Sequence, residues 1–317
     1  MRLGYMLTAL LIGSFLSLFI GVSEISITDI GQMSEDQQHI FWTSRVPRLI
    51  SIVIAGIGMS IAGLIMQQLT RNKFVSPTTA GTMDAARLGI VTAMLVFTGA
   101  GPLTQMFTAM AFAIAGTLLF MTILNRIKFK DPVFIPLVGL MFGNILGSIT
   151  TFFAYANDLI QSMEAWLQGN FATIMTGNFE TLYVTIPLVV LAYIFANRFT
   201  VAGLGEDFSK NLGLNYKQVV NLGLIIVAVI TSSIVLTVGT IPFLGLVVPN
   251  IVTIYRGDNI RKNLPHTAAL GALFVLACDI FGRVIIYPYE IPIGLTVGVL
   301  GSALFLYLLI RRRKYGL

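Results

Sequence analysis

The chain has 317 residues, of which 56% are hydrophobic and only 11% are charged. Soluble domains carry about 25% charged residues, so composition this apolar excludes a soluble protein and predicts a polytopic membrane protein. We interpret the net charge of +6 as the result of basic cytoplasmic loops that face anionic lipid, not as a nucleic-acid-binding surface. The single cysteine excludes a disulfide framework, and one cysteine with two histidines argues against a metal site.

Ten apolar segments approach the roughly 20 residues that a helix needs to cross a bilayer. They are 5–22, 47–69, 85–99, 103–125, 133–156, 182–197, 218–238, 243–254, 266–282 and 292–310. The eighth is short and contains Pro249, which favours a broken or re-entrant segment. No long hydrophilic block separates the segments, so we expect an all-α protein with about ten transmembrane helices and a single membrane domain over residues 1–317.

Ten spans place both chain ends on the same side of the membrane, and the basic residues indicate which side. With both ends in the cytoplasm, all but three of the 20 Lys and Arg residues fall on inner segments. The three exceptions, Arg45, Arg48 and Arg283, all lie near outer ends of predicted helices. Pro47 fits the first turn of its helix, where a missing N–H costs no hydrogen bond.

Large amide side chains inside the spans have two interpretations. Most polar residues there fit helix–helix packing through small residues and interhelical hydrogen bonds. Gln67, Gln68 and Asn144 are the better candidates for lining a pathway, because a large amide in lipid is costly unless it faces a partner or water.

Asp279 is the one acid well inside a predicted span, and its insertion costs about 2.5–3.5 kcal/mol. Arg283 lies four residues further on the same helical face, so the two are expected to pair. The pair is either a structural ion pair that orients Arg283 or part of a proton-coupled secondary transporter. No second acid inside a predicted span accompanies Asp279, which weakens the second interpretation.

The inner segment 199–217 is predicted to form two short amphipathic helices interrupted by glycines. Its polar and apolar faces suit either a helix lying on the lipid surface or the docking of a cytoplasmic partner. The sequence contains no G-x-x-x-x-G-K-[ST] phosphate loop, so any ATP would be bound by another subunit. Nor does it contain a catalytic constellation, so the chain is not expected to be an enzyme.

Several blocks resemble the FecCD-type permease subunits of ABC importers for iron–siderophores, haem and cobalamin. RVPRLISIVIAGIGMSIAGLIMQQLTRNKFVSPTTAGT (45–82) is similar to the family signature, and GEDFSKNLGL (205–214), GTIPFLGLVVPN (239–250) and EIPIG (290–294) are similar to later family blocks. Two positions depart from the pattern. Asn250 stands where the family usually has His, and Asn72-Lys73 stands where it has Asn-Pro.

The resemblance implies an ABC type II importer permease fold and four kinds of partner. These are a second permease chain (a homodimer or close paralogue), two cytoplasmic ATPase subunits that bind ATP and Mg²⁺, an extracytoplasmic binding protein and the cargo; no cofactor is expected on this chain itself. The site residues implied by the resemblance fall into three groups. The receptor-docking group is Arg45, Arg48 and Arg283; the inner gate is Asn72, Phe74, Asp131, Pro132 and Val133; and the ATPase-coupling loop is Gly205, Glu206, Asp207, Phe208, Ser209, Leu212 and Gly213.

The segment SPTTAGTMD (76–84) is most similar to permeases for catecholate-type ferric siderophores such as petrobactin. We therefore expect the permease subunit of a ferric-siderophore importer in the cytoplasmic membrane. An importer of the same family for haem or cobalamin remains an alternative, as does a secondary transporter that uses Asp279.

Overall fold

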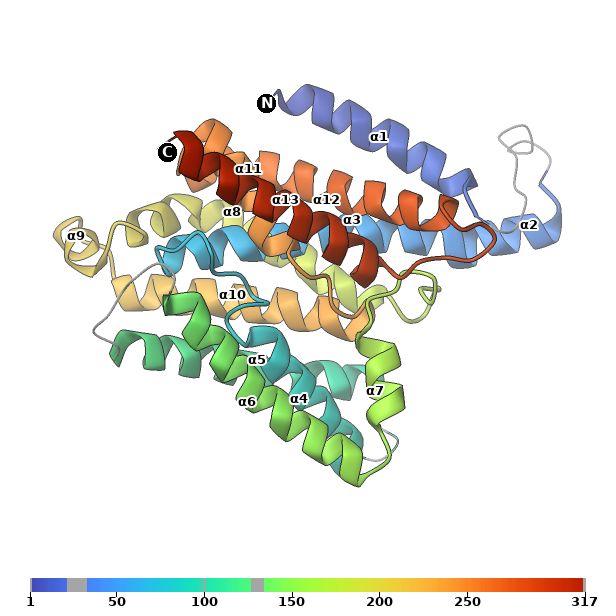
Figure 1. The fold of residues 1–317 in the computed structure, drawn as a ribbon, viewed down its shortest axis with the longest axis horizontal. Coiled ribbons are helices and arrows are strands. Elements are labelled where there is room, and N and C mark those ends of the chain that lie inside the picture. Colours follow the sequence, from blue (N-terminus) through green and yellow to red (C-terminus); the bar gives the residue numbers. More distant parts are fainter. Residues whose placement is uncertain (1, 22–32, 98, 100, 127–133, 316–317) are drawn as a thin grey trace.

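The computed structural model describes residues 2–21, 33–97, 99, 101–126 and 134–315, and every regular element within these ranges is helical (Figure 1). In chain order the elements are α1 (Leu3–Phe19), α2 (Glu35–Ile40), η2 (Phe41–Arg45), α3 (Val46–Leu69), α4 (Thr82–Val96), α5 (Pro102–Arg126), α6 (Phe134–Ala156), α7 (Ile160–Leu167), η3 (Glu180–Val184), α8 (Thr185–Ala202), α9 (Glu206–Asn211), α10 (Tyr216–Thr237), α11 (Leu244–Arg256), α12 (Ile260–Val284) and α13 (Ile293–Tyr315). Three predicted gate residues, Asp131, Pro132 and Val133, lie outside the described ranges.

Each of the ten predicted membrane segments overlaps a helix in the described part of the chain. Among the described residues, seven stretches are long and apolar enough to cross a membrane, namely Glu35–Leu69, Leu103–Leu124, Phe134–Ala156, Glu180–Ala202, Tyr216–Thr237, Ile260–Val284 and Ile293–Ile310. α1 and α11 are apolar but shorter, and α4 has 15 residues. The helical architecture of a polytopic membrane protein is therefore confirmed, while the number of ten crossings stays a prediction.

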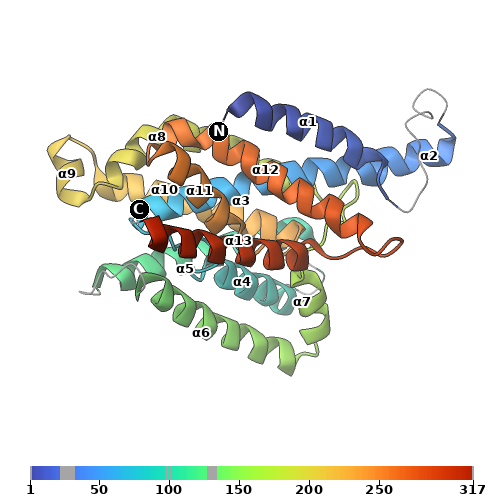
Figure 2. The same ribbon diagram turned by 45° about the horizontal axis from the view of Figure 1, so that its top comes forward.

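α3 and α10 form the centre of the bundle, since the most apolar windows of the stretches that contain them are 78% and 83% buried. Most helices run roughly along the long axis, and α7 lies across it (Figures 1 and 2). α3 makes very close contact with α11 at Gly63, where a Cβ would lie 1.9 Å from the carbonyl oxygen of Gly245. Small residues allow membrane helices to approach this closely.

α11 is as short as predicted, but it runs unbroken through Pro249. Proline has no N–H, so the carbonyl four residues before it loses its helical donor. That carbonyl belongs to Gly245, and it accepts a hydrogen bond of 3.4 Å from the side-chain amide of Gln67 on α3. A neighbouring helix thus supplies the missing donor, as membrane helices with internal prolines require.

The helix that carries Arg45 and Arg48 starts earlier than its apolar pattern indicated. The helical run begins at Glu35, where Ser34 and Gln37 form a capping box, and it passes through the π-helical turn η2 into α3. Pro47 lies in the first turn of α3, as predicted, but the turn before it is helical as well. The carbonyl of Thr43 that Pro47 leaves free accepts a hydrogen bond of 2.9 Å from the N–H of Thr176, a contact between distant parts of the chain.

α4 begins inside the bundle, because the segment that leads into it is buried: Val75, Ser76 and Ala80 are all 0% exposed. Asp84 and Arg87 on α4 form an ion pair of 3.4 Å. Asp279 is therefore not the single acid within the bundle. Arg87, which the charge pattern assigned to an inner segment, instead lines a small apolar cavity together with residues of α7 and the turn before it.

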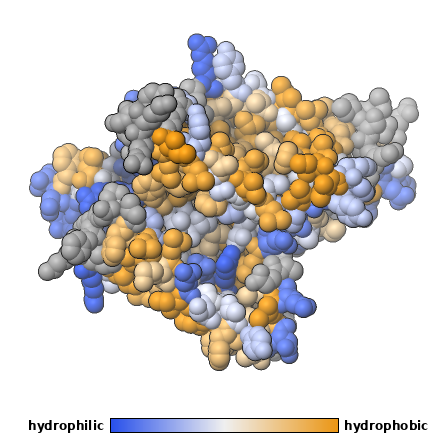
Figure 3. Space-filling view, viewed as in Figure 1, coloured by the Kyte–Doolittle hydropathy of each residue, from blue (hydrophilic) through white to orange (hydrophobic). Residues whose placement is uncertain are grey.

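Hydrophobic side chains cover much of the middle of the molecule, and hydrophilic ones gather mainly toward its ends (Figure 3). α9 projects at one end and α2 lies at the other; α13 ends on the α9 side (Figures 1 and 2). The most apolar windows of α6 and α13 are only 28% and 22% buried. These two helices therefore present broad apolar faces to the surroundings.

Candidate functional site

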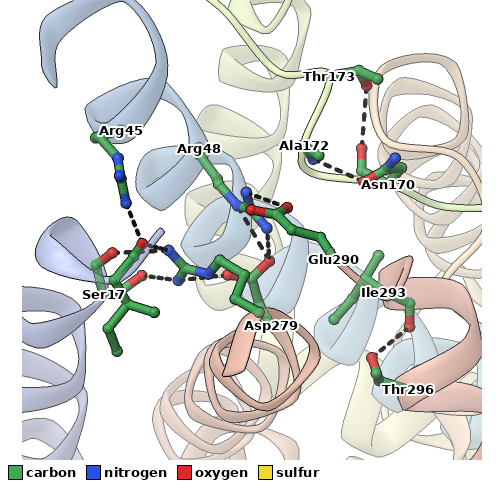
Figure 4. A network of polar contacts seen from close by, with 12 residues as sticks. Ser17, Arg45, Arg48, Asn170, Ala172, Thr173, Asp279, Glu290, Ile293 and Thr296 are labelled. Carbon is green, nitrogen blue, oxygen red and sulfur yellow. Dashed lines mark hydrogen bonds and ion pairs between the residues drawn. The ribbon is translucent and has the colours of Figure 1, made fainter. Parts of the chain in front are cut away.

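Five charged side chains meet near the α2 end of the bundle and form what we call the arginine cluster (Figure 4). They are Arg45 at the end of η2, Arg48 in the first turn of α3, Asp279 and Arg283 near the end of α12, and Glu290 in the segment before α13. α12 packs along α3, which brings them together. Three guanidinium groups and two carboxylates give the cluster one net positive charge.

Asp279 bridges two arginines, one with each carboxylate oxygen. Its Oδ1 accepts from Nη2 of Arg48 at 2.8 Å and from Nε at 3.3 Å, and its Oδ2 lies 2.7 Å from Nη2 of Arg283. Asp279 is only 5% exposed. A buried charge is tolerated when it is paired and hydrogen-bonded, so these two ion pairs account for an acid inside the bundle.

Arg283 and Arg45 also bind the end of α1. Nη1 of Arg283 donates to the carbonyl oxygens of Ser17 at 2.9 Å and Ile20 at 2.7 Å, and Nη1 of Arg45 donates to the carbonyl of Ile20. The last carbonyls of a helix lack internal donors and carry partial negative charge. Two guanidinium groups therefore satisfy and neutralise the end of α1, and this contact explains why Arg45 and Arg283 are buried, at 8% and 3% exposed.

The three arginines assigned to receptor docking thus lie together at one end, but they are engaged inside the protein. Arg48 is the closest to solvent, with a side chain that is 13% exposed. Its Nη1 lies 2.8 Å from Oε2 of Glu290, whose side chain is 23% exposed. The docking role stays a prediction. Glu290 was missed as a functional residue, although it opens the EIPIG block.

At the opposite end, the segment after α3 carries the predicted gate residues Asn72 and Phe74. Asn72 is 3% exposed, and its side-chain oxygen accepts from the N–H of Phe74 at 2.8 Å. The ring of Phe74 meets Phe305 of α13 edge-on, at 6.0 Å between centroids. The segment is also tied to α11, because the amide of Asn250 donates to the carbonyl of Lys73.

The three amides proposed to line a pathway occupy different environments. Gln67 is 3% exposed, and its Nε2 faces the carbonyls of Gly245 and Leu246 on α11. Gln68 donates to the carbonyl of Thr200 on α8 at 3.4 Å. Asn144 lies exposed on α6. The first two amides therefore meet protein partners, and a pathway-lining role stays a prediction for all three.

The coupling loop forms α9, a short helix at the end of the bundle opposite the arginine cluster. Gly205 precedes it with φ of 116°, a conformation that favours glycine, and Ser209 donates to the Gly205 carbonyl at 2.6 Å. Phe208 and Leu212 are 50% and 61% exposed. An apolar surface at the tip of a polar helix is unusual in water unless something covers it.

Charged groups line the other side of α9. Glu206 and Lys210 form an ion pair of 2.9 Å, and the hydrogen bond between them raises the pKa of Lys210. Gly213 follows the helix with φ of 75°, so the chain turns sharply before α10. Leu214, the next residue, packs against the core.

The end of α3 contacts the α8–α9 connection through two long side chains. Gln68 packs against Gly203, where a Cβ would lie 2.0 Å from its Nε2. Arg71, which has φ of 52°, places Nη1 3.1 Å from the position of a Cβ on Gly205. Because Arg71 directly precedes Asn72, the short stretch from Gln68 to Arg71 lies between the gate segment and the connection that leads into α9.

A model of the FecCD transport family matches residues 9–311. The chain belongs to the FecCD transport family. Among its FecCD relatives, the petrobactin import system permease protein YclN of Bacillus subtilis (strain 168) is 60% identical over 99% of this chain and 100% of its own length. The ferric-anguibactin transport system permease protein FatD of Vibrio anguillarum is 38% identical over 94% of this chain and 95% of its own. The vitamin B12 import system permease protein BtuC of Vibrio cholerae is 28% identical over 95% and 93%.

The fold is also found in a solved structure. A solved structure of a metal-chelate type ABC transporter, described as an inward-facing conformation, matches with a TM-score of 0.82 over 98% of both chains at 24% identity. At that identity the match supports the fold alone.

Proposed function

We propose that the chain is the permease subunit of an ABC importer that carries a ferric siderophore across the cytoplasmic membrane. The observation that carries the proposal is the 60% identity with a petrobactin import permease over essentially the full length of both chains. The related permeases named for ferric anguibactin and vitamin B12 are more distant, at 38% and 28%. A catecholate-type ferric siderophore is therefore the favoured cargo over haem or cobalamin.

α9 is the proposed docking element for the ATPase, which binds ATP and Mg²⁺ in place of this chain. The exposed apolar side chains of Phe208 and Leu212 support this role, and an importer would contain two such ATPase subunits. The α9 end of the bundle then faces the cytoplasm, as do both chain termini, and all ten predicted segments serve as spans.

The arginine cluster is the proposed docking site of the extracytoplasmic binding protein. Its location at the end opposite α9 and its net positive charge support a partner that presents carboxylates. Arg48 would contact the partner, Asp279 would hold Arg48 in position, and Arg45 and Arg283 would hold the end of α1. The weakly buried faces of α6 and α13 suit a second permease chain.

The gate residues Asn72 and Phe74, with Asp131, Pro132 and Val133, are proposed to close the inner end of a pathway between two permease chains. The buried position of Asn72 and the ring contact of Phe74 with α13 support this, because movement of α13 would act directly on the segment.

The proton-coupled alternative relies on Asp279 taking up and releasing a proton. Both of its oxygens are held by arginines at 2.7–2.8 Å, and it is 5% exposed. Asp279 thus uses both oxygens to tie Arg48 of α3 to Arg283 of α12. The geometry therefore favours a structural role for Asp279.

The test is uptake of radiolabelled iron as ferric petrobactin by cells that carry this permease with its ATPase and binding protein. Uptake should stop when the phosphate-loop lysine of the ATPase is replaced, and should continue when the proton gradient is collapsed while ATP is maintained. Uptake that follows the proton gradient and ignores the ATPase variant would contradict the proposal. Absence of ferric-petrobactin uptake together with uptake of labelled haem or cobalamin by the same importer would reassign the cargo.

A further inference from the structure

The guanidinium of Arg48 is shared between two carboxylates that are held very differently. Its Nε and Nη2 edge binds Oδ1 of Asp279, and its Nη1 binds Oε2 of Glu290 at 2.8 Å. The second oxygen of Asp279 is fixed by Arg283, and the Asp279 side chain is 3% exposed. The Glu290 side chain is 23% exposed. One partner of Arg48 is therefore anchored, and the other is the more exposed of the two (Figure 4).

We propose that Glu290 is an internal substitute for a carboxylate of the extracytoplasmic binding protein, occupying Nη1 of Arg48 until the partner's carboxylate replaces it. The proposal deepens the docking role given above and rests on it. It explains how an arginine that is already paired serves in recognition: the bond to Asp279 is kept, and one carboxylate is exchanged for another.

The exchange keeps the buried charges neutralised at each stage. Leaving a buried charge without its partner is strongly unfavourable, so a docking arginine that waited unpaired at this depth would destabilise the free permease. The charge of Glu290 also acts favourably on Arg45 and Arg283. An incoming carboxylate at the same position would take over that interaction, while Glu290 would turn into water.

The backbone around Glu290 allows its side chain to leave without a loop rearrangement. The N–H of Ile291 donates to the carbonyl of Gly282 at 3.0 Å, and the N–H of Tyr289 donates to the carbonyl of Ile286 at 3.0 Å. These bonds hold the segment on the end of α12. Rotation of the Glu290 side chain is then sufficient to expose Nη1 of Arg48.

The surface around Glu290 has the composition of a protein-binding site. Four neighbours in the α12–α13 connection are half to three-quarters exposed: Ile285 (51%), Ile286 (51%), Tyr287 (59%) and Tyr289 (75%). Aromatic residues and a central arginine are enriched where protein interfaces are strongest. The fitting partner surface carries one protruding Glu or Asp with apolar residues beside it.

The test compares binding of the purified binding protein to the complete importer in nanodiscs. Glu290→Gln keeps the size of the side chain but weakens its hold on Arg48, so the Kd should fall by roughly three- to tenfold. Arg48→Gln should raise the Kd. In the Arg48→Gln background, adding Glu290→Gln should have no further effect, because the two carboxylates no longer compete for Nη1.

A matched control separates exchange from a general change in charge. Glu180 lies at the start of η3, is also exposed, and accepts a bond from the N–H of Gly177. Glu180→Gln removes the same charge from another part of the surface and should leave the Kd unchanged. Thermal unfolding of each variant verifies that the permease remains folded.

Three results would overturn the inference in distinguishable ways. An unchanged Kd for Arg48→Gln would contradict the docking role itself. A raised Kd for Arg48→Gln together with an unchanged or raised Kd for Glu290→Gln would support the docking role of Arg48. It would reject the proposal that Glu290 is replaced by a carboxylate of the binding protein. The third result is a fall in Kd for Glu290→Gln that also occurs in the Arg48→Gln background, or that Glu180→Gln reproduces. It would show that the change in affinity comes from long-range charge.

Discussion

The side-chain amide of Asn250 on α11 donates a hydrogen bond of 2.7 Å to the backbone carbonyl of Lys73, the residue that follows Asn72 in the gate segment. The same nitrogen also donates to the carbonyl of Leu246 in its own helix at 2.8 Å. Nζ of Lys73 in turn forms an ion pair with Asp258, just after α11. The gate segment is therefore held against α11 by a hydrogen bond from the Asn250 side chain to its backbone. The ion pair between Lys73 and Asp258 holds it to the residues just after α11.

Replacing Asn250 with Ala should loosen the gate segment. The loss of this hydrogen bond is expected to cost about 1 kcal/mol of stability and to raise ATP hydrolysis in the absence of substrate, because the inner gate no longer holds one position. Both effects are measured on the reconstituted importer, by thermal unfolding and by phosphate release.

The matched variant is Asn250→His, which keeps a side-chain N–H donor. It should retain most of the transport activity. If Asn250→Ala and Asn250→His behave alike, the donor to Lys73 is not what fixes the gate segment.

The contact between Gln68 and Gly203 should transmit motion of α9 to the gate. Gly203→Ala would push a Cβ into the amide of Gln68, and Gln68→Ala would remove the amide altogether. Each variant should lower the number of substrate molecules transported per ATP hydrolysed. Because both break one contact, the double variant should be no worse than either single variant.

Gln67→Ala is the control for this experiment. It removes an equal amide one residue away, but one that faces α11. It is expected to lower stability without changing the transport-to-hydrolysis ratio. Additive losses in the Gln68–Gly203 double variant would indicate that the two positions act independently.

Asp279→Asn should lower the stability of the protein by about 3–5 kcal/mol, since it leaves two guanidinium groups without their shared charge. The folded fraction should still transport with full dependence on ATP. Thermal unfolding gives the first quantity, and uptake normalised to folded permease gives the second.

Asp258→Asn serves as the comparison for Asp279→Asn. The Asp258 side chain is 69% exposed, so this variant should change stability by less than about 1 kcal/mol. If transport by Asp279→Asn is lost while the permease stays fully stable, the structural role of Asp279 must be abandoned.

Gly63→Ala should destabilise the packing of α3 against α11. A Cβ at this position would lie 1.9 Å from a backbone oxygen that cannot easily move, and overpacking of this kind costs about 1–3 kcal/mol. Gly4→Ala on α1 is the control, because nothing lies within 4 Å of its Cβ position. Equal unfolding temperatures for the two variants would show that α3 and α11 separate readily.

Much of the fold follows from local pattern, because a long apolar segment in a membrane protein has few alternatives to a helix. Two details did not follow from it. The passage of the helix through Pro47 and the unbroken course of α11 through Pro249 both rely on donors from distant segments, Thr176 and Gln67. A hydropathy pattern contains no information about such donors.

The candidate site likewise contains one contact that the sequence predicts and others that it does not. The contact of Asp279 with Arg283 follows from their spacing of four residues on one helix. The contact of Asp279 with Arg48 spans 231 residues, and that of Arg48 with Glu290 spans 242. Both depend on how α3, α12 and the last loop pack, so Glu290 could not be singled out from the sequence.

The long separation between Arg48 and Asp279 has a consequence for biosynthesis. At about 5–20 residues per second, the ribosome reaches Asp279 roughly 10–50 seconds after Arg48. During that interval Arg45 and Arg48 have neither acid of the cluster available. α12 differs, because Asp279 and Arg283 arrive together and largely cancel each other's charge during insertion. The arginine cluster can therefore form only late in synthesis, when residues near the end of the nascent chain reach those near its beginning.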